Sequence, residues 1–289
     1  NLEVQCDGAG NTAQLNAWLA SNGGAVASDV CSNVTWSNNF ASVSDTCGAT
    51  GSATVTFTAT DNCGNASTTS ATFTIIDDTD PTITTQASNL EVQCDGAGNT
   101  AQLNAWLASN GGAVASDVCS NVTWTNNFAS VSDTCGATGS ATVTFTATDD
   151  CGNASTTSAT FTIIDDTDPT ITTQASNLEV QCDGNGNTAQ LNAWLASNGG
   201  AVASDVCSNV TWTNNFTSVS DTCGATGSAT VTFTATDNCG NASTTSATFT
   251  IIDDTDPTIT TQASNLEVQC DGAGNTAQLN AWLASNGGA

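Results

Sequence analysis

The sequence predicts a mainly β protein, a tandem array of small β-sandwich repeats that each carry one short helix and two disulfides. The first observation is a block of 88 residues that begins at Asn1, begins again at Asn89 and Asn177, and starts a fourth time at Asn265. The second is an alternation of apolar residues with threonine, and the third is a set of cysteines at the same places in every copy. Any activity must therefore be one that a repeated unit can supply.

The acidic segment 77–81, which ends in Pro81, divides one sandwich from the next. It gives repeat 1 at 1-80, whose first strand residues lie upstream, repeat 2 at 81-168, repeat 3 at 169-256 and the N-terminal part of repeat 4 at 257-289. Proline fixes its own φ and restricts the residue before it. We therefore expect a short, stiff link between consecutive repeats.

Four strands are expected in each repeat. Residues 52–60 alternate strictly, with alanine, valine and phenylalanine on one face and threonine on the other, which is typical of a half-buried strand. Residues 71–75 repeat this pattern after a turn-rich segment, so the two should pair antiparallel. Residues 2–6 form a third strand, and Val34, Trp36 and Phe40 lie on or near a fourth.

One helix is expected between the third and fourth of these strands. Leu15, Trp18 and Leu19 recur at helical spacing, and Gly23 with Gly24 provides a stop. Asn11 followed by Gln14 is typical of a variant capping box. We expect the tryptophans to pack in the core.

The cysteines predict disulfides and hence an oxidising, extracytoplasmic compartment. Their spacing contains no CxxC pair, and the chain has no histidine, which argues against zinc. Four cysteines allow three pairings. The expected strand directions place Cys6 and Cys47 at one pole and Cys31 and Cys63 at the other, which favours these two pairs. The same pairs recur as Cys94 with Cys135, Cys119 with Cys151, Cys182 with Cys223 and Cys207 with Cys239, and leave Cys270 without a partner inside the segment.

The charge composition excludes several functions. The chain has 27 acidic residues and no lysine, arginine or histidine. Side-chain salt bridges are impossible, and nucleic acids and anionic membranes would meet no cations. Without histidine, lysine, arginine or tyrosine, the chain lacks the usual catalytic bases, amines and oxyanion clamps. We therefore expect no enzymatic activity.

The carboxylates have two interpretations, a solvated acidic surface or a set of divalent-cation ligands. Oxygen ligands suit calcium, and no side-chain ammonium is present to neutralise them. Carboxylates gathered at a joint would repel one another unless a cation bridged them. The candidate calcium ligands are Asp29, Asp61, Asp77, Asp78 and Asp80, with their equivalents Asp117, Asp149, Asp165, Asp166 and Asp168.

Two stretches of each repeat resemble known families. Residues 54–65, residues 72–77 and Pro81 together resemble the hyalin repeat, an immunoglobulin-like β-sandwich of extracellular adhesive proteins. Residues 2–12, 15–20 and 27–29 look like the repeats of giant Bacteroidota cell-surface adhesins that act in gliding motility. Many hyalin repeats carry cysteines where segments 86–88 and 67–70 have none, so the disulfide of that family is not carried over.

The resemblance implies an immunoglobulin-like fold, export by the type IX secretion system and a long filament on the outer membrane. The leading hypothesis is a non-enzymatic stalk that gives reach and stiffness for attachment or gliding. It would bind a surface or polysaccharide ligand through regions outside the segment. Two alternatives remain open: multivalent calcium-dependent repeats that bind ligand or polysaccharide themselves, and a self-associating extracellular fibre. The sequence leaves the oligomeric state open.

Overall fold

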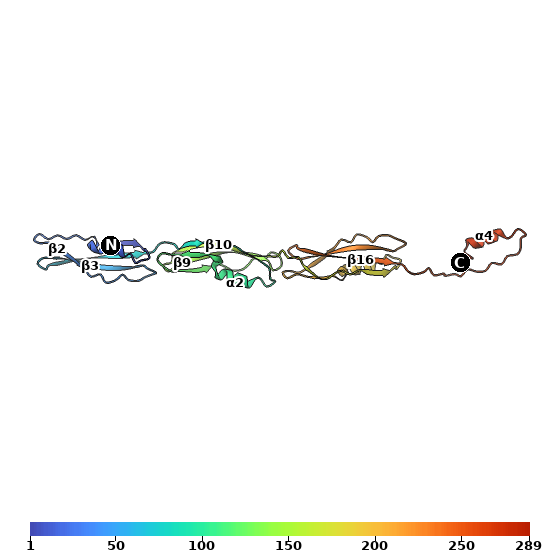
Figure 1. Ribbon diagram of the computed structural model, residues 1–289, viewed down its shortest axis with the longest axis horizontal. Helices are drawn as coiled ribbons and strands as arrows, with labels where there is room; N and C mark the ends of the chain where they lie inside the picture. Colours follow the sequence, from blue (N-terminus) through green and yellow to red (C-terminus); the bar gives the residue numbers. More distant parts are fainter. The chain divides into compact units, whose positions relative to one another are not determined.

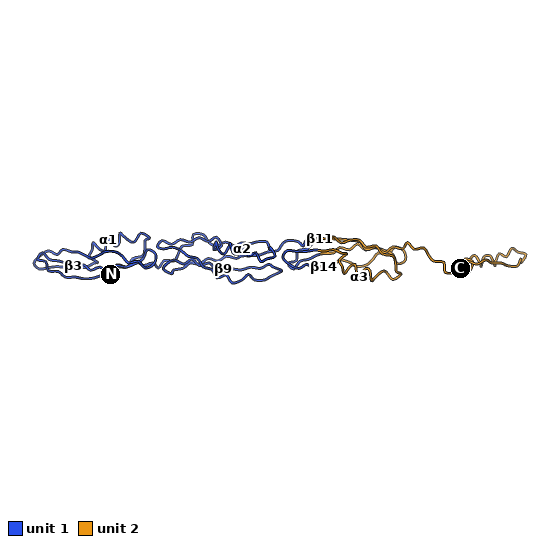
Figure 2. Tube along the Cα trace, turned by 90° about the horizontal axis from the view of Figure 1, so that it is seen from below, with its two compact units in different colours: residues 1–170, 203–211, 235–243 blue, residues 171–202, 212–234, 244–289 orange.

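A computed structural model describes residues 1–289, in which the chain forms two compact units (Figure 2). Unit 1 comprises Asn1–Thr170, Ala203–Thr211 and Ala235–Ser243. Unit 2 comprises Ile171–Val202, Trp212–Thr234 and Thr244–Ala289. Two loops of the third repeat therefore belong to the same compact unit as the first two repeats.

The first repeat, in unit 1, contains one four-stranded sheet and one helix. In chain order its elements are β1 (Leu2–Gln5), α1 (Thr12–Ala20), the 3-10 turn η1 (Asn22–Gly24), β2 (Val34–Asn38), β3 (Gly51–Asp61) and β4 (Ala66–Ile76). The sheet order is β1-β4-β3-β2. Strand β1 runs parallel to β4, whereas β3 is antiparallel to both β4 and β2. All four expected strands and the antiparallel pairing of 52–60 with 71–75 are confirmed, although Phe40 lies just beyond β2.

The second repeat repeats this sheet and adds a smaller one. Its elements are β5 (Thr82–Thr85), β6 (Leu90–Gln93), α2 (Thr100–Ala108), η2 (Asn110–Gly112), β7 (Val114–Ser116), β8 (Val122–Asn126), β9 (Gly139–Asp149) and β10 (Ala154–Ile164). The four-stranded sheet has the order β6-β10-β9-β8, and β5 pairs antiparallel with β7. Figure 1 shows the long strands β9 and β10 side by side. The β5–β7 sheet was not expected from the sequence.

The third repeat contains β11 (Thr170–Thr173), β12 (Leu178–Gln181), α3 (Thr188–Ala196), η3 (Asn198–Gly200), β13 (Val202–Ser204), β14 (Thr211–Asn214), β15 (Gly227–Thr236) and β16 (Ala242–Ile252). Its sheet order, β12-β16-β15-β14, matches the other two repeats. In the fourth copy only α4 (Thr276–Ala284) forms. No strand of this copy forms against the helix, and Leu279 and Leu283 are exposed.

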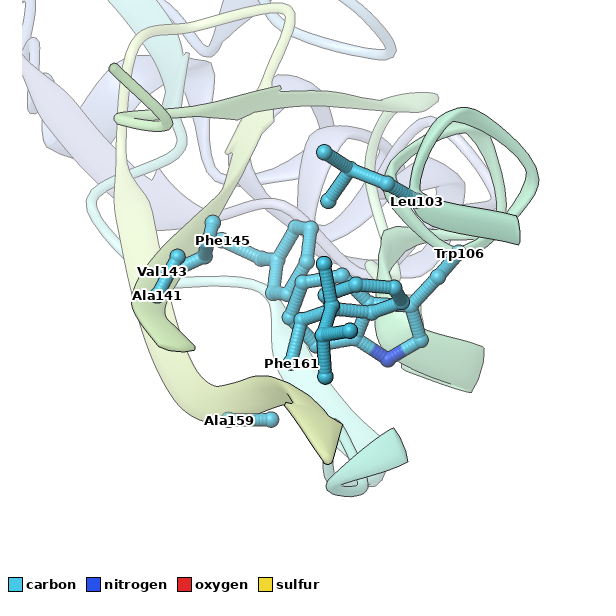
Figure 3. Close-up of a cluster of buried hydrophobic side chains, with 8 residues drawn as sticks. Leu103, Trp106, Ala141, Val143, Phe145, Ala159 and Phe161 are labelled. Atoms are coloured by element: carbon cyan, nitrogen blue, oxygen red, sulfur yellow. The ribbon is translucent and has the colours of Figure 1, made fainter. Parts of the chain in front are cut away.

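The core of the second repeat lies between the helix and the inner face of the sheet (Figure 3). Helix α2 contributes Leu103 and Trp106, and the strands contribute Phe145 and Phe161, which are completely buried. The Trp106 ring meets Phe145 edge-on at 5.3 Å and Phe161 at 5.7 Å between centroids. The same residues recur in the other two clusters, which confirms the expected fold class, a tandem array of immunoglobulin-like β-sandwich repeats with one short helix each.

The expected capping box at the start of the helix is wrong. Asn11 adopts a left-handed conformation, with φ of 50°, and makes no side-chain cap hydrogen bond. Its amide instead donates to the Gln5 carbonyl at 2.7 Å, while the Asp7 carboxylate accepts from the Asn11 backbone at 2.9 Å. Asn11 is fully buried, so its side chain serves to tie the helix start to strand β1 rather than to cap the helix.

Candidate functional site: the joint between repeats

The disulfides link each repeat to its neighbour. Cys6 of the first repeat is bonded to Cys119 of the second, and Cys47 is bonded to Cys151. The corresponding cysteines of the next joint form Cys94–Cys207 and Cys135–Cys239. The Cα–Cα distances are 6.0, 5.2, 5.9 and 5.2 Å, within the range of an ordinary disulfide. All eight cysteines belong to unit 1.

The predicted pairing inside each repeat is therefore wrong, although the predicted poles agree with the strand directions. Cys6 follows β1 and Cys47 precedes β3, so both lie at the end of the sheet that faces the next repeat. That repeat presents cysteines from its opposite pole, and these take the place of the expected partner. The cysteines that remain free are Cys31, Cys63, Cys182, Cys223 and Cys270.

Backbone groups close the joint around the disulfides. The Ala49 N–H donates to the Cys119 carbonyl at 2.8 Å, which joins the two repeats by a main-chain hydrogen bond. A Cβ on Gly8 would lie 2.5 Å from the Val118 carbonyl oxygen, and one on Gly48 would lie 2.5 Å from that of Cys119. Only glycine allows the two backbones to approach this closely.

The second joint reproduces these contacts. Ala137 donates to the Cys207 carbonyl at 2.8 Å. The space beside Gly96 and Gly136 is again filled by backbone oxygens, here those of Val206 and Cys207, at 2.5 Å from a built Cβ. The joint is thus a repeated interface rather than a variable linker.

Two acidic residues order the loops that enter the joint. Asp149 accepts hydrogen bonds from the backbone of Cys151, Gly152 and Asn153, at 2.6 to 2.9 Å, and from the Asn153 amide. Burial opposes ionisation, but these donors outweigh it and lower the pKa of Asp149 below its usual value. Asp117 accepts in the same way from the backbone of Cys119 and Ser120. Both carboxylates hold a cysteine in position for its bridge.

Asp77 brings a less well-partnered carboxylate to the same joint. Its Oδ2 atom is buried and has no hydrogen-bond partner, and the equivalent atom of Asp165 is in the same situation. Burial raises the pKa of Asp77, and the charges of Asp117 and Asp149 raise it further, although a hydrogen bond from Thr79 works in the opposite direction. The first repeat thus places a carboxylate near two carboxylates of the second.

The structure brings some of the predicted calcium ligands together. Oxygens of Asp77 and Asp117 and the Cys119 sulfur all lie within 4.8 Å of one another, and Asp165, Asp205 and Cys207 form the same group at the next joint. Each of these sulfurs is in a disulfide, so only the carboxylates can act as strong ligands. Calcium takes six to eight oxygens, so water would have to supply most of a shell at this site.

The other predicted ligands lie apart from this group or have other partners. Asp29 and Asp61 lie at the opposite end of their own repeat from Asp77, because β3 and β4 are antiparallel. Asp78, like its equivalent Asp166, is exposed and accepts a hydrogen bond from a glutamine, Gln5 in the first repeat. Asp80 accepts from the Ala154 backbone across the joint at 3.2 Å, and Asp168 makes the equivalent contact.

An open groove runs along each joint. The first is about 720 Å³ and is lined mainly by polar groups, among them Asp45, Thr46, Ser120, Asn121 and Asp150. The second joint carries the same groove at about 710 Å³, with Asn238 in place of the aspartate. One of the four variable positions of the repeat therefore lies in this groove.

Sequence reasoning missed the residues through which the repeats contact each other. These are the glycines Gly8 and Gly48, the exposed Val118 and the Asn153 amide, which donates to the Asp77 carbonyl at 3.1 Å. A signal did exist in the sequence, since every cysteine of a repeat is preceded or followed within two residues by glycine or aspartate. That pattern indicates tight turns around the cysteines, but it does not say which repeat each turn contacts.

No family model and no curated protein matches the chain. Among solved structures, it is similar to a mouse protocadherin fragment, PcdhgC3 EC1-3, at 11% identity over 71% of this chain and 77% of that chain, with a TM-score of 0.26. It is also similar to Drosophila N-cadherin EC1-4, at 10% identity over 69% of this chain and 57% of that chain, with a TM-score of 0.27. The human desmocollin-1 ectodomain matches at 12% identity over 74% of this chain and 50% of that chain, with a TM-score of 0.23. None of the helices has the length and apolar character needed to cross a membrane. At such low scores these similarities carry no argument about function, and the fold assignment rests on the strand topology.

Proposed function

We propose that the chain is the non-enzymatic, repetitive stalk of a giant bacterial cell-surface adhesin. It acts outside the cell as part of a filament attached to the outer membrane. Its resemblance to hyalin-like repeats of Bacteroidota surface adhesins supports a role in attachment or gliding after type IX secretion. The repeats supply reach and stiffness, while the surface or polysaccharide ligand is bound elsewhere on the filament.

The observation that carries this proposal is the repeated joint. Two disulfides and a main-chain hydrogen bond connect the first repeat to the second, and the same set recurs at the following joint. A flexible linker would need none of these contacts, and a binding module would not need them in every copy. A spacer does, because its length depends on the angle between consecutive repeats staying fixed.

Deleting one whole repeat tests the proposal. Removal of residues 89–176 preserves the register of every cysteine, since the deleted segment is one full period. For a spacer, the filament should shorten by one repeat while the affinity of each molecule for its surface stays the same. Duplication of the same segment is the matched control and should lengthen the filament equally. A graded loss of avidity with constant reach would contradict the spacer function.

We propose in addition that calcium binds at the joint beside Asp77 and Asp117. The buried, unpartnered Oδ2 of Asp77 supports this, since a cation there would offset three neighbouring negative charges. Calorimetry and thermal melts of the oxidised chain, in calcium and in chelator, test the site. Binding should raise the melting temperature in calcium, and Asp77→Asn with Asp165→Asn should abolish the difference. Identical melts of the unaltered chain would contradict a calcium site.

The polar groove favours a second candidate, in which the repeats bind polysaccharide weakly and gain strength from their number. Its variable position, Asn62, Asp150 or Asn238, is the kind of place where ligand preference would differ between copies. Titration with oligosaccharides distinguishes this candidate from the spacer. The fibre alternative is distinguished by counting chains in isolated filaments.

A further inference from the structure

We propose that the disulfides limit how far the array can extend, so that a repeat pulled open by force cannot lengthen the chain by its full contour. This inference deepens the stalk function and rests on it for its biological setting. The mechanical argument itself depends only on which cysteines are joined and on how the strands pair.

The covalent path through the second repeat is short. Bridges from the first repeat arrive at Cys119 and Cys151, and bridges to the third repeat leave from Cys94 and Cys135. The departure point nearest along the chain is Cys135, which lies ~16 residues from Cys119 and equally far from Cys151. Tension in a fully unfolded repeat would therefore pass through ~16 residues of chain, and the rest of the repeat would hang as unloaded loops.

The difference in length is large. Sixteen or so residues stretch to ~55 Å at ~3.4 Å per residue, whereas a whole repeat of 88 residues would stretch to ~300 Å. Strands β9 and β10 have 11 residues each and already span ~37 Å in the folded repeat. Complete unfolding thus adds ~18 Å to a span of ~37 Å, whereas a repeat without bridges would add ~260 Å.

The strand order also opposes the first step of unfolding. The entry strand β6 lies parallel to the exit strand β10, with Leu90 beside Phe161 and Gln93 beside Ile164. Once the bridges are reduced, tension enters at β6 and leaves at β10 through the backbone, so it acts along both strands and loads their hydrogen bonds together rather than one after another. β1 and β4 repeat the arrangement, with Leu2 beside Phe73.

One bridge at each joint has a buried cysteine. Cys119 and Cys207 are only 8% exposed, and the backbone contacts of Gly8 and Gly96 cover the same region. A reductant therefore reaches them poorly in the folded array. The covalent limit on extension is in place before any force is applied.

Single-molecule stretching of the whole oxidised chain by its two ends tests the inference. The shortest covalent path between the ends uses ~71 residues, so full unfolding should give a contour length of ~240 Å. After reduction the same chain should reach ~980 Å. If the cysteines were paired inside each repeat instead, the shortest covalent path of the oxidised chain would be more than twice as long. A contour length of that size would overturn the inference.

Two variants make the test specific. Replacing Cys6, Cys47, Cys119 and Cys151 by serine opens only the first joint and should lengthen the oxidised path to ~175 residues, or ~600 Å. The matched control, Cys31→Ser with Cys63→Ser, changes two free cysteines and should leave the oxidised length unchanged. If the first variant has nearly the same oxidised length as the unaltered chain, the pairing argued here is wrong. Neither result bears on the spacer function, which the repeat deletion tests separately.

Discussion

Removing one bridge of the first joint gives the sharpest test of the fold in bulk solution. We consider the double variant Cys6→Ser with Cys119→Ser, which leaves the Cys47–Cys151 bridge in place. With that bridge intact, the lost bond closed a circuit of ~73 residues, and a loop of that size contributes about 4 kcal/mol by restricting the unfolded chain. The two linked repeats should unfold as a pair, for which such a loss lowers the melting temperature by about 10 °C.

The assay is thermal unfolding followed by far-ultraviolet circular dichroism, without reductant. The control is again Cys31→Ser with Cys63→Ser, since the structure leaves both thiols free, and its melting temperature should stay within about 1 °C. Pairing inside the repeat predicts the opposite for this control, because a Cys31–Cys63 bridge would close a loop of ~32 residues and contribute roughly 3 to 4 kcal/mol. A control that melts as low as the bridge variant would refute the cross-joint pairing.

Three further predictions address the joint. Gly96→Ala should weaken the second joint, because its Cβ would meet the Val206 carbonyl. The matched control is Gly184→Ala, which has a similar positive φ but open space beside it and should cost only the backbone strain. Differential scanning calorimetry compares the melting temperatures of the two variants. In chelator at pH 7, Asp165→Asn should raise the melting temperature and Asp237→Asn should lower it. Burial raises the pKa of Asp165, so the stability that its protonated form contributes is lost as pH rises through that pKa. At Asp237, hydrogen bonds outweigh burial and lower the pKa, so the stability that its ionised form contributes is present at neutral pH and lost in acid. A pH series of melts checks both signs. Dilute-acid cleavage at Asp80–Pro81 and the two equivalent bonds should leave residues 1–256 as one species until reductant is added, and separation without reductant would contradict the bridges.

The repeat itself could be predicted from the sequence because its signals are local. Alternation over residues 52–60 and 71–75 predicted β3 and β4, and the spacing of Leu15 and Trp18 predicted α1. Periodicity reports which face of an element is buried, and burial inside one repeat is decided within that repeat. Strand β5 has one apolar residue, Ile83, among three threonines, and β7 has only three residues, so neither shows a clear alternation.

The joint could not be predicted because every copy offers the same partners. Cys6 was correctly placed at the pole it shares with Cys47, but an identical sequence in the next repeat supplies Cys119 at an equally suitable position. Cys119 is the equivalent of Cys31, at the opposite pole, and spacing within one repeat does not show that this pole of the next repeat lies against Cys6. The carboxylates behave in the same way: Asp77 was grouped with Asp61, whereas it meets Asp149, the equivalent residue of the following repeat.

The offset between bridge partners has a consequence for how the protein matures. Since Cys6 and Cys47 need cysteines that lie 113 and 104 residues further along, neither can be oxidised correctly until the following repeat has emerged and folded. Each repeat therefore keeps two unpaired thiols until the repeat that follows it has folded. A bond formed too early, between Cys6 and Cys47 on their shared pole, would leave Cys119 and Cys151 without partners, and the correct bridges could then form only by thiol–disulfide exchange.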